Sequence, residues 1–141
     1  MLSWYEFNGE TAWAAKGEES GMIRYTPQGN WATYVEYDGE QKEVTLFAGQ
    51  TINVGTVHFS EPVDETVTIT ITLTGDWEFD EVEENVKIQD YETAPSGNPS
   101  IGLFDHKGDA TGSSFSIDVT ENNYYGVHVD VGYWVSGDCE E

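Results

Sequence analysis

Acidic side chains crowd one short segment of the chain and recur in a loop downstream, and this pattern has the clearest capacity for chemistry. Calcium takes about six to eight oxygen ligands in flexible geometry, which carboxylates, amides and backbone carbonyls supply. The candidate calcium ligands are Asp76, Asp80, Glu81, Glu84, Asn85, Asp105 and Asp109. A solvated acidic face is the alternative, because the chain is acidic throughout and lacks an Asp-x-Asp-x-Asp-Gly loop.

The three histidines, His58, His106 and His128, offer imidazoles to a transition metal, but none has a partner ligand at helical spacing. We expect ordinary strand and loop positions for all three. His128 and Asp130 are two residues apart in an alternating segment, so they should share the strand face opposite the neighbouring valines.

Aromatic residues suggest a second kind of site, a platform on which sugar rings stack. The candidates are Trp31, Trp77, Tyr91 and Trp134. Core packing is the competing explanation, since aromatic side chains dominate the interiors of small β proteins. Sugar binding predicts at least two rings exposed side by side.

Motifs of catalysis are missing from the sequence. It has no Gly-x-Ser-x-Gly elbow, no glycine-rich phosphate loop, no His-Glu-x-x-His and no Cys-His couple. Paired carboxylates are so abundant that they do not discriminate a glycoside hydrolase. We therefore expect a protein that is not an enzyme.

The charge balance limits the partners. Asp and Glu number 27 against 5 Lys and Arg, which gives a formal net charge of -22 on 141 residues. Nucleic acid and anionic membranes are disfavoured, because they carry charge of the same sign. Mutual repulsion predicts that calcium or high salt supports the folded state, as in halophilic proteins. Hydrophobic residues at 38% and aromatics at 13% are nevertheless enough to form a core.

Strict alternation of apolar and polar residues marks several strands, most clearly residues 66–74, 115–119 and 125–133. Turn signals every 8 to 12 residues or so predict an all-β fold, an antiparallel sandwich of about eight or nine strands. Residues 80–85 are the best candidate for one short helix, and residues 11–16 are a second. We expect a single domain over residues 1–141, with residues 1–21 as an extended arm and residues 136–141 as a frayed acidic tail.

One combination of short motifs resembles a β-rich module found in secreted and cell-surface proteins of bacteria and archaea. It consists of residues 45–50 (TLFAGQ), 54–57 (VGTV), 74–77 (TGDW), 97–99 (GNP) and 102–107 (GLFDHK). The resemblance covers roughly residues 44–119 and implies an extracellular β module. It transfers no catalytic residue, because the module has no established activity.

These observations favour a noncatalytic extracellular or cell-surface module that acts in adhesion or in surface-layer or filament assembly, supported by calcium or salt. Its partners would be copies of itself or other cell-surface proteins. A carbohydrate-binding module is the alternative function. The first residues lack the basic region and apolar stretch of a signal peptide, so an exported protein should have lost its signal before residue 1.

Overall fold

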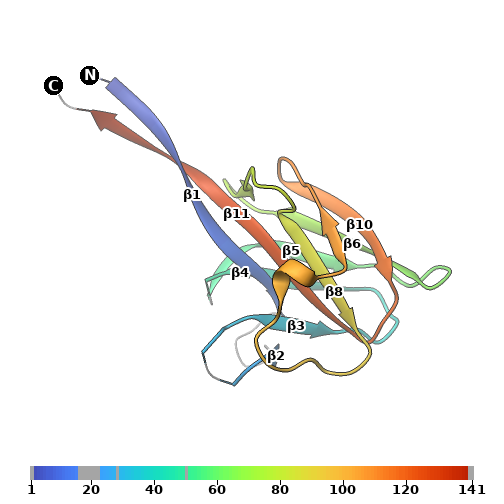
Figure 1. Ribbon diagram of the computed structural model, residues 1–141. Helices are drawn as coiled ribbons and strands as arrows, with labels where there is room; N and C mark the ends of the chain where they lie inside the picture. The colour runs from blue at the N-terminus through green and yellow to red at the C-terminus, as the bar shows by residue number, and fades with distance from the viewer. Residues whose placement is uncertain (1, 16–22, 28, 50, 140–141) are drawn as a thin grey trace.

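The computed structural model describes residues 2–15, 23–27, 29–49 and 51–139, with side chains over residues 7–135 of these ranges. The chain is all-β, as predicted (Figure 1). Eleven strands are formed within the described residues, more than the eight or nine expected. They are β1 (Leu2–Ala15), β2 (Ile23–Arg24), β3 (Thr33–Glu36), β4 (Lys42–Ala48), β5 (Ile52–Phe59), β6 (Thr66–Leu73), β7 (Glu78–Phe79), β8 (Val86–Tyr91), β9 (His106–Gly108), β10 (Ser114–Thr120) and β11 (Tyr124–Cys139).

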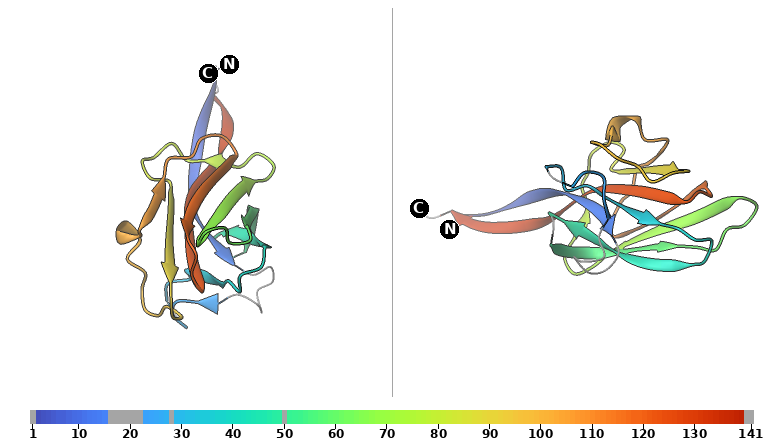
Figure 2. Two further views of the ribbon diagram at one scale, coloured as in Figure 1. Left: turned by 90° about the vertical axis from the view of Figure 1, so that its right-hand side faces the viewer. Right: turned by 90° about the horizontal axis from the view of Figure 1, so that it is seen from below.

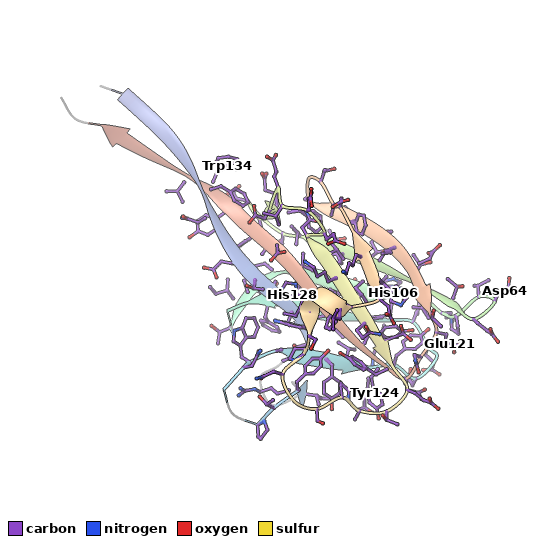
Figure 3. The ribbon with its side chains drawn as sticks, viewed as in Figure 1. Asp64, His106, Glu121, Tyr124, His128 and Trp134 are labelled. Carbon is purple, nitrogen blue, oxygen red and sulfur yellow. The ribbon has the colours of Figure 1, made fainter. Side chains whose placement is uncertain are left out.

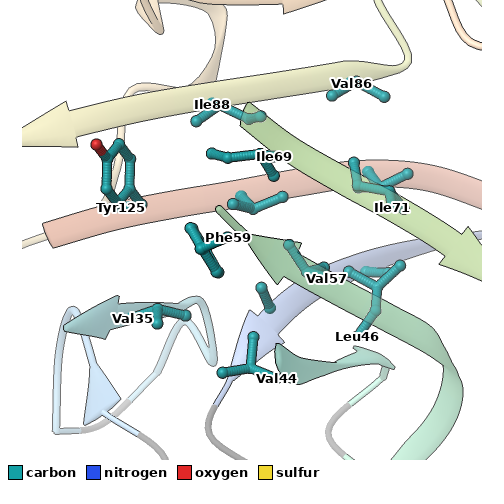
Figure 4. Close-up of a cluster of buried hydrophobic side chains, with 14 of the residues drawn as sticks. Val35, Val44, Leu46, Val57, Phe59, Ile69, Ile71, Val86, Ile88 and Tyr125 are labelled. Atoms are coloured by element: carbon teal, nitrogen blue, oxygen red, sulfur yellow. The ribbon is translucent and has the colours of Figure 1, made fainter. Parts of the chain in front are cut away.

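All strand pairs are antiparallel and belong to one continuous sheet, in the order β10-β6-β5-β4-β1-β11-β3-β2. Strands β7 and β8 pair with the other side of β11, and β9 pairs with β8. The sheet curls back on itself in a sandwich-like arrangement, so that β4, β5 and β6 pack against β8 and β11 around a shared core (Figure 4). The antiparallel sandwich prediction is therefore confirmed at this level.

The threonine-rich segment behaves as its alternation predicts. Val67, Ile69 and Ile71 of β6 are completely buried, while the threonines between them face outward. Thr68 Oγ1 donates a hydrogen bond of 2.7 Å to Asp118 Oδ1 on β10, and Thr70 and Ser116 share one of 2.8 Å. Cross-strand polar pairs thus occupy the solvent side of this sheet, while branched apolar side chains fill its inner side.

Both helix predictions are wrong. Residues 81–84 form a turn between β7 and β8, where Glu84 adopts a left-handed φ of 53°. Residues 11–15 belong to β1, because they pair with β11 and β4. The one helix in the described residues is the short 3-10 turn η2 (Ile101–Leu103), and no described helix has the length and apolarity that a membrane span requires.

The two ends of the chain also differ from expectation. Strand β1 is paired with β11 over its length from Leu2 to Trp13, so residues 2–15 are not an unpaired arm, and residues 136–139 are paired strand rather than a frayed tail. Residues 1, 16–21 and 140–141 of these predictions lie outside the described residues. The paired strands β1 and β11 project from the body as a two-stranded ribbon, with Leu2 and Cys139 at its far tip (Figures 1 and 2).

Candidate functional site

The predicted calcium ligands separate into distinct places. Asn85, only 2% exposed, is held by backbone: its Nδ2 donates to the carbonyls of Asp80 and Ala110, both at 2.8 Å, and its Oδ1 accepts from Ala110 N at 2.7 Å. This side chain fastens the β7–β8 turn to the loop before β10. Asp109 Oδ1 accepts a 2.7 Å hydrogen bond from Glu84 N in the same turn.

Asp105 and Asp76 lie away from this turn. Asp105 and Asp109 flank β9 at its two ends, four residues apart, which is about 13 Å along a strand. Asp105 Oδ2 accepts from Gln89 Nε2 at 2.9 Å, and Asp76 lies in the loop after β6 beside Trp77. Glu81 lies in the exposed β7–β8 turn and lines one hollow together with Asn85 and Asp109. Among the described residues, no group of three or more Asp, Glu, His or Cys side chains is arranged to hold a metal ion, and calcium binding stays a prediction.

The histidines occupy three different environments, and Figure 3 labels two of them, His106 and His128. His58 lies on β5 between Glu43 of β4 and Thr70 of β6. His106 Nε2 lies 2.7 Å from Asp90 Oδ1, whose second oxygen accepts from Asn122 Nδ2 at 2.9 Å. Burial alone would raise the pKa of Asp90, but these two hydrogen bonds lower it below the ordinary value.

His128 does not lie on a wet strand face, contrary to the sequence expectation. It is 5% exposed, Trp13 contacts its ring edge-to-face at 5.0 Å, and its Nδ1 has no hydrogen-bond partner among the described residues. Burial, with a smaller contribution from the Lys87 ammonium, lowers the pKa of His128 to about 4. Asp130 shares this face as predicted, and burial raises its pKa.

An aromatic cluster that the sequence analysis missed explains this burial. Trp13, Tyr25, Tyr34 and Phe104 cover the second face of β11, and two of the predicted ligand-binding residues, Trp31 and Tyr91, are partly buried against them. Tyr25 and Tyr91 join their hydroxyls at 2.9 Å. Gly126 is required here, because a Cβ at this position would collide with the Tyr25 hydroxyl. This end of the molecule is therefore packing, not an open platform.

The other two predicted aromatics, Trp77 and Trp134, do come together, at the base of the ribbon. Trp134, labelled in Figure 3, is 51% exposed. Its Nε1 donates a 2.8 Å hydrogen bond to Glu78 Oε1. Phe7, the residue paired with Trp134 across the ribbon, packs its ring against the indole edge-to-face at 5.1 Å. Trp77 makes a similar contact with Tyr133 at 4.9 Å.

Two hollows adjoin at this point, with volumes of about 430 and 450 Å³. Both are lined by Gly75, Asp76, Trp77 and Trp134. Glu10 and Tyr133 complete the first, and Glu78 and Ser113 contribute to the second. Trp77 is presented by a tight turn in which its N–H donates to Thr74 O at 3.2 Å and Gly75 takes a φ of 60°. We call these residues together the ribbon-base site.

Sequence reasoning did not single out Glu10, Glu78 or Tyr133 for this site. One signal was present: the alternation of β11 continues past Val131 with Tyr133 on the core-side face and Trp134 on the other, so aromatic residues occupy both faces beyond the core.

The ribbon edges are the other surface of note. On the side of β1 away from β11, β4 pairs only with residues 12–15, and β7 meets β11 only at residues 131–132. Within the described residues, therefore, no third strand pairs with residues 2–11 of β1 or with residues 133–139 of β11.

Comparisons of the chain with protein-family models, with curated proteins and with solved structures find no match.

Proposed function

We propose that this protein is a noncatalytic assembly module, in which two copies join by pairing the free edges of their β1 strands. The observation that carries the proposal is the projecting ribbon, whose β1 edge lacks a partner strand over residues 2–11 among the described residues. A two-stranded ribbon is marginally stable by itself, and an unpaired edge is a template for another strand. The β1 edge is favoured over that of β11, because it is longer and carries the strong β formers Trp4, Tyr5 and Phe7.

The distribution of charge supports assembly at this place. Of the 27 acidic residues, only Glu6 and Asp138 fall in residues 2–9 and 132–139. Two β1 strands running antiparallel across a two-fold axis would leave the acidic bodies at opposite ends of an eight-residue overlap. This separates them by about 26 Å, beyond the Debye length of about 10 Å at 0.1 M salt. The ribbon is thus where two copies approach with least repulsion.

An extracellular or cell-surface location and a role in surface-layer, filament or adhesive structures complete the proposal. They rest on the resemblance of residues 44–119 to a secreted module and on the acidic composition. Growth beyond a dimer needs a second contact, which β10 offers at the far end of the sheet order, where its outer edge has no strand partner in the described residues.

Single proline substitutions at Tyr5 and Glu6 test the edge contact. Consecutive N–H groups of a strand point to opposite sides, so one substitution removes an N–H facing the free edge and the other removes one facing β11. We expect sedimentation in high salt to show a dimer for the native protein. The variant that loses the N–H facing the free edge should be a monomer with an unchanged melting temperature. The variant that loses the N–H facing β11 should have a lower melting temperature. A native protein that stays monomeric at every salt concentration, or dimers with both variants, would refute the proposal.

A further inference from the structure

We propose that the ribbon-base site binds an organic cation, an alkylammonium group seated against the exposed indole of Trp134. Three carboxylate residues, Glu10, Asp76 and Glu78, line the two hollows. Among the residues that the structure describes, no Lys or Arg lines either one. The four described basic side chains donate to carbonyls elsewhere: Arg24 to Gly29 and Asn30, Lys42 to Glu36, Lys87 to Glu84 and Lys107 to Gly102. The site therefore presents uncompensated negative charge.

The aromatic walls add to this field. The face of an indole ring is negative and attracts cations, Trp more strongly than Tyr or Phe. Trp134 donates its N–H to the Glu78 carboxylate at 2.8 Å, and an anion on that N–H increases the negative potential of the ring. Phe7 packs against the indole at 5.1 Å, and the Trp134 side chain remains half exposed. The Trp134 indole and the Glu78 carboxylate would therefore both attract the positive charge of the ligand.

The same geometry argues against two other ligands. A calcium ion needs about six to eight oxygens, whereas aromatic surfaces interrupt the carboxylates here. A sugar platform needs rings exposed side by side, but Trp134 is the one exposed ring of the four candidates, since Trp31, Trp77 and Tyr91 are partly buried. An alkylammonium group uses both features, because its methyl or methylene groups pack on rings while its charge meets carboxylates. Hollows of 430 to 450 Å³ lie in the range of small-ligand sites.

Two sources of this chemistry exist: a free quaternary ammonium compound, or a lysine side chain of a partner protein. The probes are therefore choline and a short lysine-containing peptide with blocked ends. The neutral controls are 3,3-dimethylbutan-1-ol, which has the shape of choline without its charge, and a disaccharide. Titrations follow tryptophan fluorescence at constant ionic strength, with calorimetry as a second readout. The site shares Glu10 with the β1 edge, so the titrations are run on the native protein and repeated on the monomeric proline variant. Binding by that monomer distinguishes this result from the assembly test.

We expect saturable binding of choline, of the lysine peptide or of both at millimolar concentration, and weaker binding of the neutral alcohol. Trp134→Ala should weaken the affinity by about 3- to 30-fold, and Trp134→Phe by less. Glu78→Gln should also weaken it, whereas Glu43→Gln, an equal change of net charge on β4, should not. Trp31→Phe controls for the loss of a fluorophore, and a melting curve shows that each variant folds.

The outcomes decide the proposal. Binding of either cation with loss in Trp134→Ala supports it, and the tighter of the two identifies the source. Equal binding of choline and its neutral analogue, binding of the disaccharide alone, equal losses in Glu43→Gln and Glu78→Gln, or no binding of any probe would each overturn it.

Discussion

The two halves of strand β11 differ in how many of their faces are covered and in how many strands pair with them. Over residues 124–131 it is covered on both faces, by the main core on one side and on the other by the aromatic cluster of Trp13, Tyr25, Tyr34 and Phe104, called the Trp13 cluster below. Its core-facing side chains have no exposed surface: Tyr125, Val127, Val129 and Val131. Over residues 133–139 it has β1 as its one strand partner within the described residues. One strand is therefore buried within the body over residues 124–131 and forms half of the projecting ribbon over residues 133–139. We expect the first half to dominate stability, and the proposed assembly and ligand contacts involve the second half.

Replacing a tyrosine by alanine in each half of β11 should give the largest difference in the free energy of unfolding between the two halves. Tyr125 and Tyr133 lie on the same face of β11, but Tyr125 is fully buried and its hydroxyl donates to Thr120 O at 2.7 Å. We expect Tyr125→Ala to lower the free energy of unfolding by about 3–5 kcal/mol and Tyr133→Ala by about 1 kcal/mol or less. Urea unfolding at fixed salt measures both. Similar losses in the two variants would show that the ribbon half is as strongly packed as the body.

Lowering the pH should weaken the body half through His128. Its pKa is about 4 in the folded protein against 6.5 in the unfolded chain, so the unfolded state binds the proton more readily. The stability from neutral His128 is present above pH 6.5 and is lost as the pH falls from 6.5 towards 4, by as much as about 3 kcal/mol.

Other groups titrate in the same direction or against it, so the test is a difference between two proteins. The lowered pKa of Asp90 removes stability as the pH falls further, while the raised pKa of Asp130 adds stability. The difference between the native protein and His128→Phe in the free energy of unfolding should change between pH 7 and pH 4. A constant difference would mean that His128 titrates alike in the folded and unfolded states, so that burial does not lower its pKa.

The junction between the two halves is sensitive to a single methyl group. A Cβ at Gly132 would collide with the Phe7 ring and the Asn8 carbonyl, so the ribbon must shift to accept it. Gly132→Ala should cost about 1–3 kcal/mol and change the fluorescence of Trp134, whose neighbour Phe7 moves. Gly102→Ala is the matched control, because no atom lies within 4 Å of its Cβ, and its effect should stay below about 0.5 kcal/mol. Equal effects would place the sensitivity outside the junction.

The sequence predicts correctly which side chains are buried where apolar and polar residues alternate along a strand and one face of that strand packs on the core. The buried faces of β6 and β11 follow from their valines and isoleucines. It fails where a second layer covers the other face, because His128 and Asp130 are typical of a solvent side and the Trp13 cluster comes from segments with weak strand signals. The helix expected at residues 80–85 fails for a related reason: glutamates favour helix, but the Asn85 hydrogen bonds to Asp80 and Ala110 hold the segment as a turn.

The candidate site follows the same division. Trp77 and Trp134 line the same two hollows, whereas Trp31 and Tyr91 are partly buried against the aromatic cluster on the second face of β11. The register that pairs Phe7 with Trp134 places Trp134 at the base of the ribbon. Strand register depends on pairing between residues more than a hundred positions apart, which no local pattern contains.

The pairing of Leu2 with Cys139 at the tip of the ribbon also determines how the protein would respond to a mechanical load applied to these two residues. Leu2 and Cys139 face each other across the pair. A load that pulls these two residues apart breaks one cross-strand residue pair at a time, beginning at the tip of the ribbon and moving towards the body. The body carries no load until the opening reaches Val131 and Ala12, where β7 and β4 pair with the two strands. The ribbon would therefore yield first at low force and lengthen while the core stays folded.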